Sequence, residues 1–264
     1  MSSRNMNSRQ TDNSNQPGDV LLSIRHLNLS FGGVKATDDV TLDLRAGIVT
    51  TLIGPNGAGK TTLFNQITGH LTPDGGEIVW LGDSILGRKP YEIARKGIAR
   101  TFQDLRLFHE MTVEENVLTV MEHNALPFSF AGPSRAEKRA RVDEILTRLG
   151  LSGKRRVLAA DLAYAERKFL SMARIMAAGA KLWLLDEPAS GLDPNSYDLF
   201  LRILREEVAK GVTVCIIEHN LDIVVQISDR ICFLDRGKLL ADGDPRSVLD
   251  DPALAAIYFG DRAA

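Results

Sequence analysis

The alternation of apolar and polar positions predicts β-strands in the first third of the chain. Residues 21–31 (LLSIRHLNLSF) and 40–47 (VTLDLRAG) alternate with a period of two, as antiparallel strands with one solvated face do. Residues 77–86 (EIVWLGDSIL) predict another strand pair with a turn at Gly82 and Asp83. Residues 48–54 (IVTTLIG) form a continuous apolar run that ends at a glycine, and a helical pattern follows at residues 61–69 (TTLFNQITG). We expect a strand, a glycine-rich loop and a helix beside antiparallel strands.

Helical periodicity and charge dominate the middle of the chain, between about residues 88 and 156. Residues 134–150 (SRAEKRARVDEILTRLG) are the clearest example, and loop signals precede them at residues 126–133. An amphipathic helix is predicted at residues 165–179 (AERKFLSMARIMAAG), and the apolar run in KLWLLDEP at residues 181–188 is typical of a central parallel strand. This pattern predicts a helical subdomain inserted into an α/β core.

The last third of the chain repeats the alternation of helix and strand. The helices are expected at residues 198–211 (DLFLRILREEVAKG) and 221–229 (LDIVVQISD), with a buried strand between them at residues 211–220 (GVTVCIIEHN). Residues 230–243 (RICFLDRGKLLADG) predict a hairpin. The order of these elements indicates an α/β fold with a parallel sheet.

Composition adds limits on the partners of the chain. The 264 residues carry a formal net charge of -2, so no global charge attracts nucleic acid or an anionic bilayer. The apolar runs are shorter than the roughly 18 residues that a membrane span needs, and residues 1–19 are polar and lack a secretory apolar segment. We expect a cytoplasmic protein with a disordered polar tail at 1–19. Cys215 and Cys232 lie in apolar runs and predict buried thiols, not a disulfide or a zinc site.

A phosphate-binding loop is the strongest chemical signal in the sequence. Residues 54–61 fit the pattern G-x-x-x-x-G-K-[ST] and lie between a predicted strand and a predicted helix. Backbone N–H groups of such a loop surround phosphate oxygens, Lys60 neutralises phosphate charge, and the Thr61 hydroxyl is a ligand for Mg²⁺. A simple glycine-rich turn is the alternative. The predicted ATP-binding residues here are Gly54, Pro55, Asn56, Gly57, Ala58, Gly59, Lys60, Thr61 and Thr62.

Adjacent carboxylates end the apolar strand at residues 182–185. Asp186 suits the role of holding Mg²⁺, and Glu187 is placed to orient or deprotonate an attacking water. Such a pair on a surface means little, but two ionised carboxylates at a buried strand end are costly without a cation. His219 follows the next apolar strand and is expected at the same sheet edge, where it would contact the γ-phosphate or serve only as a structural histidine. Gln103 is a weak signal alone.

The order of these motifs resembles the nucleotide-binding domain of ATP-binding cassette (ABC) transporters over about residues 20–260. The resemblance rests on Phe31, GPNGAGKT, Gln103, LAYAE, LLDEP, SGLD and His219. It implies that Phe31 stacks on adenine, although Phe31 could instead close a core. It also implies that Gln103 touches Mg²⁺, that His219 is the switch histidine, and that Lys60, Glu187 and His219 are catalytic. The metal-binding residues would be Thr61, Gln103 and Asp186, and the D-loop would be Ser190, Gly191, Leu192 and Asp193.

This family has a P-loop NTPase (RecA-like) core with an antiparallel β-subdomain and an inserted α-helical subdomain. The resemblance therefore implies one nucleotide-binding domain over residues 20–264, with the core at about 20–88 and 167–264 and the helical subdomain at about 89–166. The resemblance also implies that the chain binds ATP and hydrolyses it with Mg²⁺ as cofactor. The alternatives are a regulatory ATP-binding subunit with little turnover and a soluble non-transport ABC protein that acts on ribosomes or DNA.

Further segments resemble the ATPase subunits of branched-chain amino acid importers and their relatives for small polar solutes. These segments are FGGVKATDDV, RTFQDLRLFHEMTVEENV and AAIYFG. The resemblance implies two transmembrane permease subunits, a periplasmic solute-binding protein, no nucleic acid, and a peripheral place on the cytoplasmic face of the inner membrane. The stretch from RTFQ to ENV would receive a coupling helix.

The signature segment departs from the family pattern of Leu-Ser-Gly-Gly-Gln or Leu-Ser-Tyr-Gly-Glu. Its residues are Leu162, Ala163, Tyr164, Ala165 and Glu166. In the family this segment approaches the ATP of the opposite subunit, and Ala163 cannot donate the serine hydrogen bond, which contributes about 1.5–3 kcal/mol when the partner is charged. The departure predicts a heterodimer with a sister ATPase whose signature is intact. A homodimer and a tolerated variant with normal turnover are the alternatives.

Overall fold

The structure, a computed structural model, describes residues 18–123 and 134–260. The expected disordered tail at 1–19 lies outside the described residues except for Gly18 and Asp19, which exchange backbone hydrogen bonds with Ala46. The loop expected at 126–133 also lies outside them.

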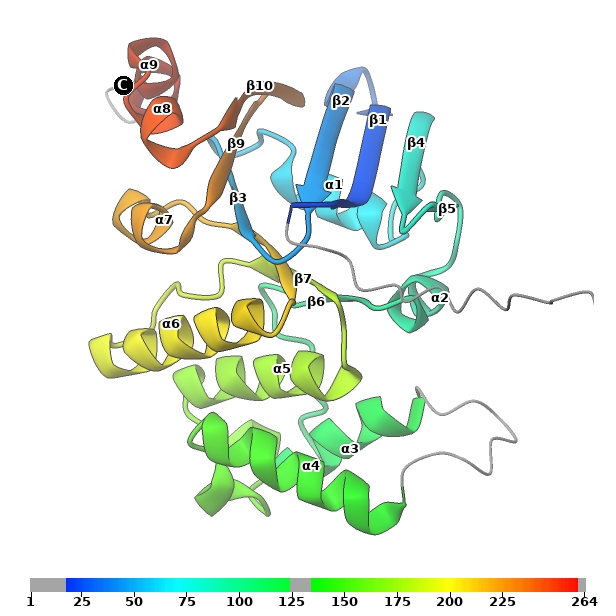
Figure 1. Ribbon diagram of the computed structural model, residues 1–264, viewed down its shortest axis with the longest axis vertical. Helices are drawn as coiled ribbons and strands as arrows, with labels where there is room; N and C mark the ends of the chain where they lie inside the picture. Colours follow the sequence, from blue (N-terminus) through cyan, green and yellow to red (C-terminus); the bar gives the residue numbers. More distant parts are fainter. Residues whose placement is uncertain (1–17, 124–133, 261–264) are drawn as a thin grey trace, which may run out of the picture.

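The alternating residues near the start form a separate antiparallel sheet of four strands, as predicted. Its order is β2-β1-β4-β5, so the first strand lies between the second and the fourth (Figure 1). Leu22, Ile24 and Leu42 are buried, while polar residues between them face outward. The strands are β1 (Val20–Phe31), β2 (Val34–Arg45), β4 (Gly75–Trp80) and β5 (Asp83–Ser84).

The continuous apolar runs form the central sheet, because strands covered on both faces have no polar side. Its order is β10-β9-β3-β8-β7-β6, and β9, β3, β8, β7 and β6 are mutually parallel. Every residue of β3, β7 and β8 is buried. The strands are β3 (Val49–Ile53), β6 (Ile98–Arg100), β7 (Leu182–Asp186), β8 (Thr213–Ile217), β9 (Arg230–Asp235) and β10 (Lys238–Gly243).

One boundary of the predicted helical subdomain needs correction. Strand β6 lies inside the segment assigned to that subdomain (89–166), yet it pairs with β7 in the central sheet. Three residues are too few to produce a detectable period among helical neighbours, which is why the pattern did not reveal this strand.

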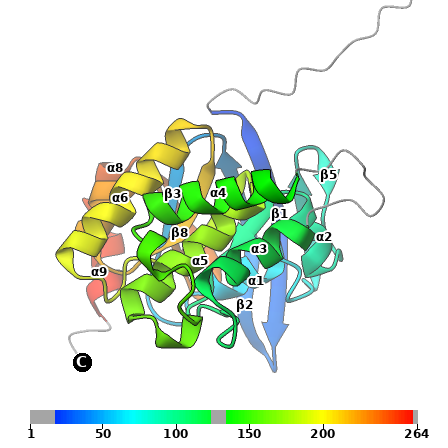
Figure 2. The same cartoon turned by 90° about the horizontal axis from the view of Figure 1, so that it is seen from below.

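Helices enclose the central sheet. Figures 1 and 2 show α3, α4 and α5 gathered on the side away from the antiparallel sheet, with α6 beside α5. The helices are α1 (Lys60–Ile67), α2 (Pro90–Arg95), α3 (Val113–His123), α4 (Arg135–Arg148), α5 (Tyr164–Ala178), α6 (Pro194–Ala209), α7 (Leu221–Ile227), α8 (Pro245–Leu249) and α9 (Pro252–Gly260), with short 3-10 turns at Ser152–Lys154 and Ala159–Asp161.

Two large hydrophobic cores lie on opposite faces of the central sheet. Successive residues of a strand point to opposite faces. Trp183 and Leu185 of β7 therefore pack with α3–α6, whereas Leu184 packs toward α1 and the antiparallel sheet. Cys215 and Cys232 are free and buried, as predicted. Within the described residues, every helix is too short or too polar to cross a bilayer.

Candidate functional site

The glycine-rich loop connects β3 to α1 and begins the site. A side chain at Gly54 would place its Cβ 1.9 Å from the carbonyl oxygen of Leu234, and one at Gly59 would place it 2.2 Å from that of Ala36. Both residues also have positive φ angles, of 142° and 101°. Glycine is therefore required at both positions, and the loop passes closely against β9 and β2 before α1 begins at Lys60.

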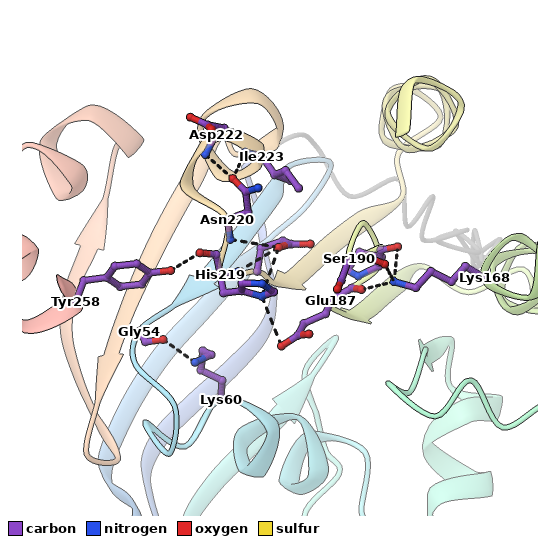
Figure 3. Close-up of polar contacts among 12 residues, drawn as sticks. Gly54, Lys60, Lys168, Glu187, Ser190, His219, Asn220, Asp222, Ile223 and Tyr258 are labelled. Carbon is purple, nitrogen blue, oxygen red and sulfur yellow. Dashed lines mark hydrogen bonds and ion pairs between the residues drawn. The ribbon is translucent and has the colours of Figure 1, made fainter. Parts of the chain in front are cut away.

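Lys60 folds back over this loop. Its Nζ donates hydrogen bonds to the carbonyl oxygens of Gly54 at 2.7 Å and Pro55 at 2.9 Å (Figure 3). Burial lowers the pKa of Lys60, while the nearby carboxylates Glu187 and Asp186 act to raise it. Thr61 is exposed in the first turn of α1, where backbone N–H groups and the helix dipole favour an anion.

Asp186, the last residue of β7, is paired with an arginine that we did not predict from the sequence. Arg100 Nη2 donates to Asp186 Oδ2 at 3.0 Å, and both side chains are nearly fully buried. Arg100 Nη1 donates to Asn65 Oδ1 at 2.6 Å. Burial raises the pKa of Asp186 above its ordinary value, and the guanidinium opposes that rise. Arg100 thus supplies the positive charge that the buried Asp186 carboxylate requires.

Glu187 follows Asp186 but lies in a different environment. Its φ of 47° is in the left-handed region, which is uncommon for a residue with a side chain. Its N–H donates to the carbonyl of Ile217 at 3.0 Å, which fixes this turn against the end of β8. Its Oε1 lies 3.7 Å from Nδ1 of His219 (Figure 3). The carboxylate of Glu187 and the imidazole therefore share one edge of the sheet.

Hydrogen bonds on both sides hold the segment that carries His219. The buried Glu218 carboxylate accepts from the backbone N–H groups of His219 and Asn220, and the Asn220 side chain caps α7. The Tyr258 hydroxyl of α9 donates to the carbonyl of His219 at 2.5 Å. Local hydrogen bonds and one contact from the distant helix α9 thus fix the backbone that carries the imidazole.

Gln103 lies in the turn after β6 and is exposed. It lines a small cleft of about 50 Å³ together with Asp186, Glu187 and Tyr164. Gln103, Asp186 and Glu187, which sequence reasoning assigned to the site, therefore border the same space.

The signature segment begins α5. Ala163 is the N-cap residue, and its backbone N–H donates to the Glu166 carboxylate at 2.9 Å. The side chain of Ala163 cannot accept a hydrogen bond from the exposed first turn, so only half of a capping box is formed. Lys154 pairs with Glu166. Tyr164 packs against Gly191, where a Cβ would lie 3.0 Å from the ring.

The remaining predicted site residues lie at the ends of other elements. Phe31 ends β1 with half of its surface exposed, which leaves its ring free to stack on a planar group. Asp193 of the D-loop caps α6 by accepting from Asn195 and Ser196. It is therefore a structural residue in this chain as well as a predicted site residue.

The oxygen donors at this edge fit Mg²⁺ held jointly with a nucleotide. Among the described residues there is no cluster of three or more His, Cys, Asp or Glu side chains that would bind a metal alone. Thr61 offers a hydroxyl, Asp186 a carboxylate and Gln103 an amide oxygen, all of them hard ligands. Mg²⁺ is usually bound by one or two such groups together with phosphates.

Two buried basic residues of the site, Arg100 and Lys168, escaped the sequence interpretation. Arg100 is the last residue of β6, a strand too short to be identified from the pattern, and Lys168 lies on the charged part of an amphipathic helix. An exposed position is the usual one for both residue types, so their burial is visible only in the folded chain.

Comparison with known proteins assigns this geometry to a family. The model of the family described as "ABC transporter" matches residues 37–190. The chain is 39% identical over 250 residues to the high-affinity branched-chain amino acid transport ATP-binding protein BraF of Pseudomonas aeruginosa, with 91% of this chain and 98% of BraF covered. It is also 39% identical to LivG of Escherichia coli, with the same coverage over 252 residues.

Solved structures agree with the sequence comparison. The ADP conformation of MJ1267, an ATP-binding cassette of an ABC transporter, superimposes with a TM-score of 0.81 at 34% identity and covers 92% of this chain and 99% of that one. A nucleotide-free ATP-binding cassette superimposes with the same TM-score at 33% identity, covering 91% and 99%. The chain belongs to the ABC transporter family, as an ATP-binding subunit with the P-loop NTPase fold.

Proposed function

We propose that this chain is an Mg²⁺-dependent ATPase that powers uptake of branched-chain or similar amino acids. The observation that carries the proposal is the meeting of Lys60, Asp186, Glu187 and His219 at one edge of the central sheet. Amino acid transport is what the printed names of BraF and LivG state for those relatives.

Each side chain of the site has a separate role in the transfer of the γ-phosphoryl group from ATP to water. Phosphates replace the carbonyl groups of Gly54 and Pro55 as the partners of Lys60, and the N–H groups of the glycine-rich loop hold the oxygens. Glu187 orients the attacking water and accepts its proton, while His219 supports the charge that develops on the γ-phosphate. Thr61, Gln103 and Asp186 would hold Mg²⁺, which neutralises phosphate charge when bound. Phe31 would stack on adenine.

A groove beside this site supports the proposed permease partners. It encloses about 440 Å³ and is lined mainly by apolar groups from the turn after β6, from α3 and from α5, including Phe102, Phe108 and Ile175. Arg106 stacks on Phe102 and Arg174 on Phe108 at the wall of the groove. This combination suits an amphipathic segment of a membrane subunit that carries a carboxylate. Binding of such a segment would hold the chain at the membrane, on the face that we propose to be the cytoplasmic one.

The signature segment supports a sister ATPase as a further partner. In the proposed dimer each ATP lies between the glycine-rich loop of one subunit and the signature of the other. The Ala163 side chain has no hydroxyl to offer, so the site served by this signature is the weaker one. A sister subunit with an intact signature would complete the site built on Lys60 and Glu187.

Replacement of Glu187 by Gln tests the proposed chemistry. The amide keeps the size of the side chain but cannot accept a proton, so we expect Mg-ATP turnover to fall about 100-fold or more while Mg-ATP affinity stays within about twofold. Turnover by the purified chain and equilibrium binding of a fluorescent ATP analogue measure the two quantities. If turnover is equally low in the wild-type and variant chains, and stays so when a chain with an intact signature is added, the chain is a regulatory ATP-binding subunit instead.

The same variant tests the transport assignment in cells. Uptake of radiolabelled leucine, isoleucine and valine would be compared in cells that carry the wild-type chain, the Glu187→Gln chain or no chain. Loss of uptake in the last two supports the proposal. Normal uptake of all three amino acids with the variant would exclude them as the transported solutes.

A further inference from the structure

Lys168 is a buried lysine that neither the glycine-rich loop nor the metal-binding set uses. It lies on α5, one helical turn beyond Tyr164 of the signature segment, and only 7% of its surface is exposed. Its Nζ donates hydrogen bonds to three backbone carbonyl oxygens: Glu187 at 2.8 Å, Pro188 at 3.2 Å and Ser190 at 2.5 Å. Figure 3 shows Lys168 reaching the turn that carries Glu187 and Ser190.

This contact matches the chemistry of a lysine ammonium group completely. An ammonium has three N–H donors and no acceptor, and each donor finds one carbonyl here. The ring of Tyr164 also lies 5.2 Å from Nζ, which adds a favourable cation–π contact. A positive charge is therefore held in a buried place by carbonyl dipoles of a single turn, and no carboxylate of residues 18–123 or 134–260 forms an ion pair with it.

The turn that Lys168 holds has a strained backbone. Glu187 has a φ of 47°, which costs free energy in a residue with a side chain. Within the turn, the Ser190 N–H donates to the Glu187 carbonyl over 3.4 Å, a long hydrogen bond. The same Glu187 carbonyl accepts the shorter bond from Lys168. Lys168 is thus the stronger of the two contacts that hold this carbonyl in place.

We propose that Lys168 is a positioning residue that keeps the catalytic Glu187 in its strained turn and ties that turn to the signature helix. The inference rests on the proposed function. In the dimer the signature faces the ATP of the opposite subunit, whereas Glu187 serves the ATP of its own. Lys168 and the packing of Tyr164 on Gly191 connect the signature helix α5 to the turn that carries Glu187. A shift of α5 that follows ATP binding at the opposite subunit therefore moves the Glu187 carboxylate of this subunit.

Replacement of Lys168 by Met tests this role, because Met keeps the length and apolar stem but has no donor. We expect kcat for Mg-ATP to fall about 10- to 100-fold, the effect of losing charged hydrogen bonds, with KM within about twofold. Hydrogen exchange of the Ser190 and Leu192 amides should become at least about tenfold faster. Lys168→Arg restores a cation with donors and should recover kcat to within about fivefold of wild type.

Lys210→Met is the matched control. Lys210 follows α6 and pairs with Glu207, which keeps Arg148 as a second partner, so both kcat and exchange of the Ser190 amide should be unchanged. A Lys168→Met chain with wild-type kcat and wild-type exchange overturns the proposal, as does a folded Lys168→Arg chain that is as slow as Lys168→Met. If Mg-ATP is turned over neither by the wild-type chain alone nor by the wild-type chain mixed with a chain whose signature is restored, the proposed function fails, and exchange at Ser190 alone decides the role of Lys168.

Discussion

Single residues set the charge balance at the nucleotide edge of the sheet. Arg100 and Asp186 form a buried pair whose separation would leave an uncompensated charge, at a cost of about 3–5 kcal/mol. Phe64 and Phe102 lie against the guanidinium with centroid distances of 5.4 and 4.8 Å, which fixes its orientation. The Asp186 carboxylate, which we propose as an Mg²⁺ ligand, is therefore held in one place by side chains of the protein itself.

Ala163 of the altered signature also affects the stability of the fold. Ala163 has the extended backbone of an N-cap residue, with φ of -62° and ψ of 161°, but its side chain cannot accept from the first turn. Ala163→Ser would complete the cap with Glu166 and should raise the free energy of unfolding by about 1 kcal/mol. For a domain of this size Tm should rise by roughly 2–4 °C, measured by calorimetry.

Ser134 provides the opposite control for this prediction. Its hydroxyl accepts from the N–H of Glu137 at 3.2 Å and caps α4. Ser134→Ala should therefore lower Tm by a similar amount. A lower Tm for Ala163→Ser would mean that the N-terminus of α5 cannot accommodate a hydroxyl, and Ala163 would then not be an incomplete N-cap that a serine completes.

Sequence motifs predict the residues of the candidate site, but they do not reveal the residues that hold those side chains in place. The spacing of Gly54, Gly59 and Lys60 predicts a phosphate-binding loop, because each position has a distinct task at a phosphate. Arg100, Lys168 and Tyr258 carry no such spacing. Their partners are a side chain or backbone carbonyls more than 15 positions away, and only the folded chain brings these groups together.

At the scale of elements, long regular patterns were predictable and short ones were not. The parallel strands β3, β7 and β8 and the helices α5 and α6 follow from runs of apolar residues with a clear period. Strand β6 has three residues, and its pairing with β7 depends on long-range contacts that local pattern does not contain. This strand matters because it delivers Arg100 and Gln103 to the site.

The contact of helix α9 with the His219 backbone can be tested by a single substitution. Tyr258→Phe removes the hydroxyl that donates to the His219 carbonyl but keeps the ring, which packs 6.2 Å from Phe233. The loss of one hydrogen bond on this backbone should lower Mg-ATP turnover about two- to tenfold and leave Mg-ATP affinity unchanged. Steady-state turnover with a parallel binding titration measures both effects.

Tyr197→Phe serves as its control, since it removes a tyrosine hydroxyl that bonds the side chain of Gln226 and not the His219 carbonyl. Equal turnover losses in the two variants would mean that α9 has no specific influence on His219.

At the scale of the whole molecule, the layered fold separates two surfaces, the edge of the central sheet and the apolar groove, to which we assign different partners. The central sheet presents the glycine-rich loop, Asp186, Glu187 and His219 along one edge, while α5 begins with the signature segment and lines the apolar groove further along its length. A complete ATP site requires a second subunit under the proposed function. The groove lies between the central sheet and the helical layer, where movement of α3 and α5 would change its shape.

A mixing experiment tests the central claim most directly, that each ATP is hydrolysed between one subunit's Glu187 and the other subunit's signature. A triple variant, Ala163→Ser, Ala165→Gly and Glu187→Gln, carries a restored signature but cannot hydrolyse its own ATP. Mixed with the wild-type chain in equal amounts, it should raise turnover at least about fivefold above the wild-type chain alone at the same concentration, because the missing donor weakens the site about 10- to 100-fold. Turnover equal to the average of the two separate solutions would contradict this claim.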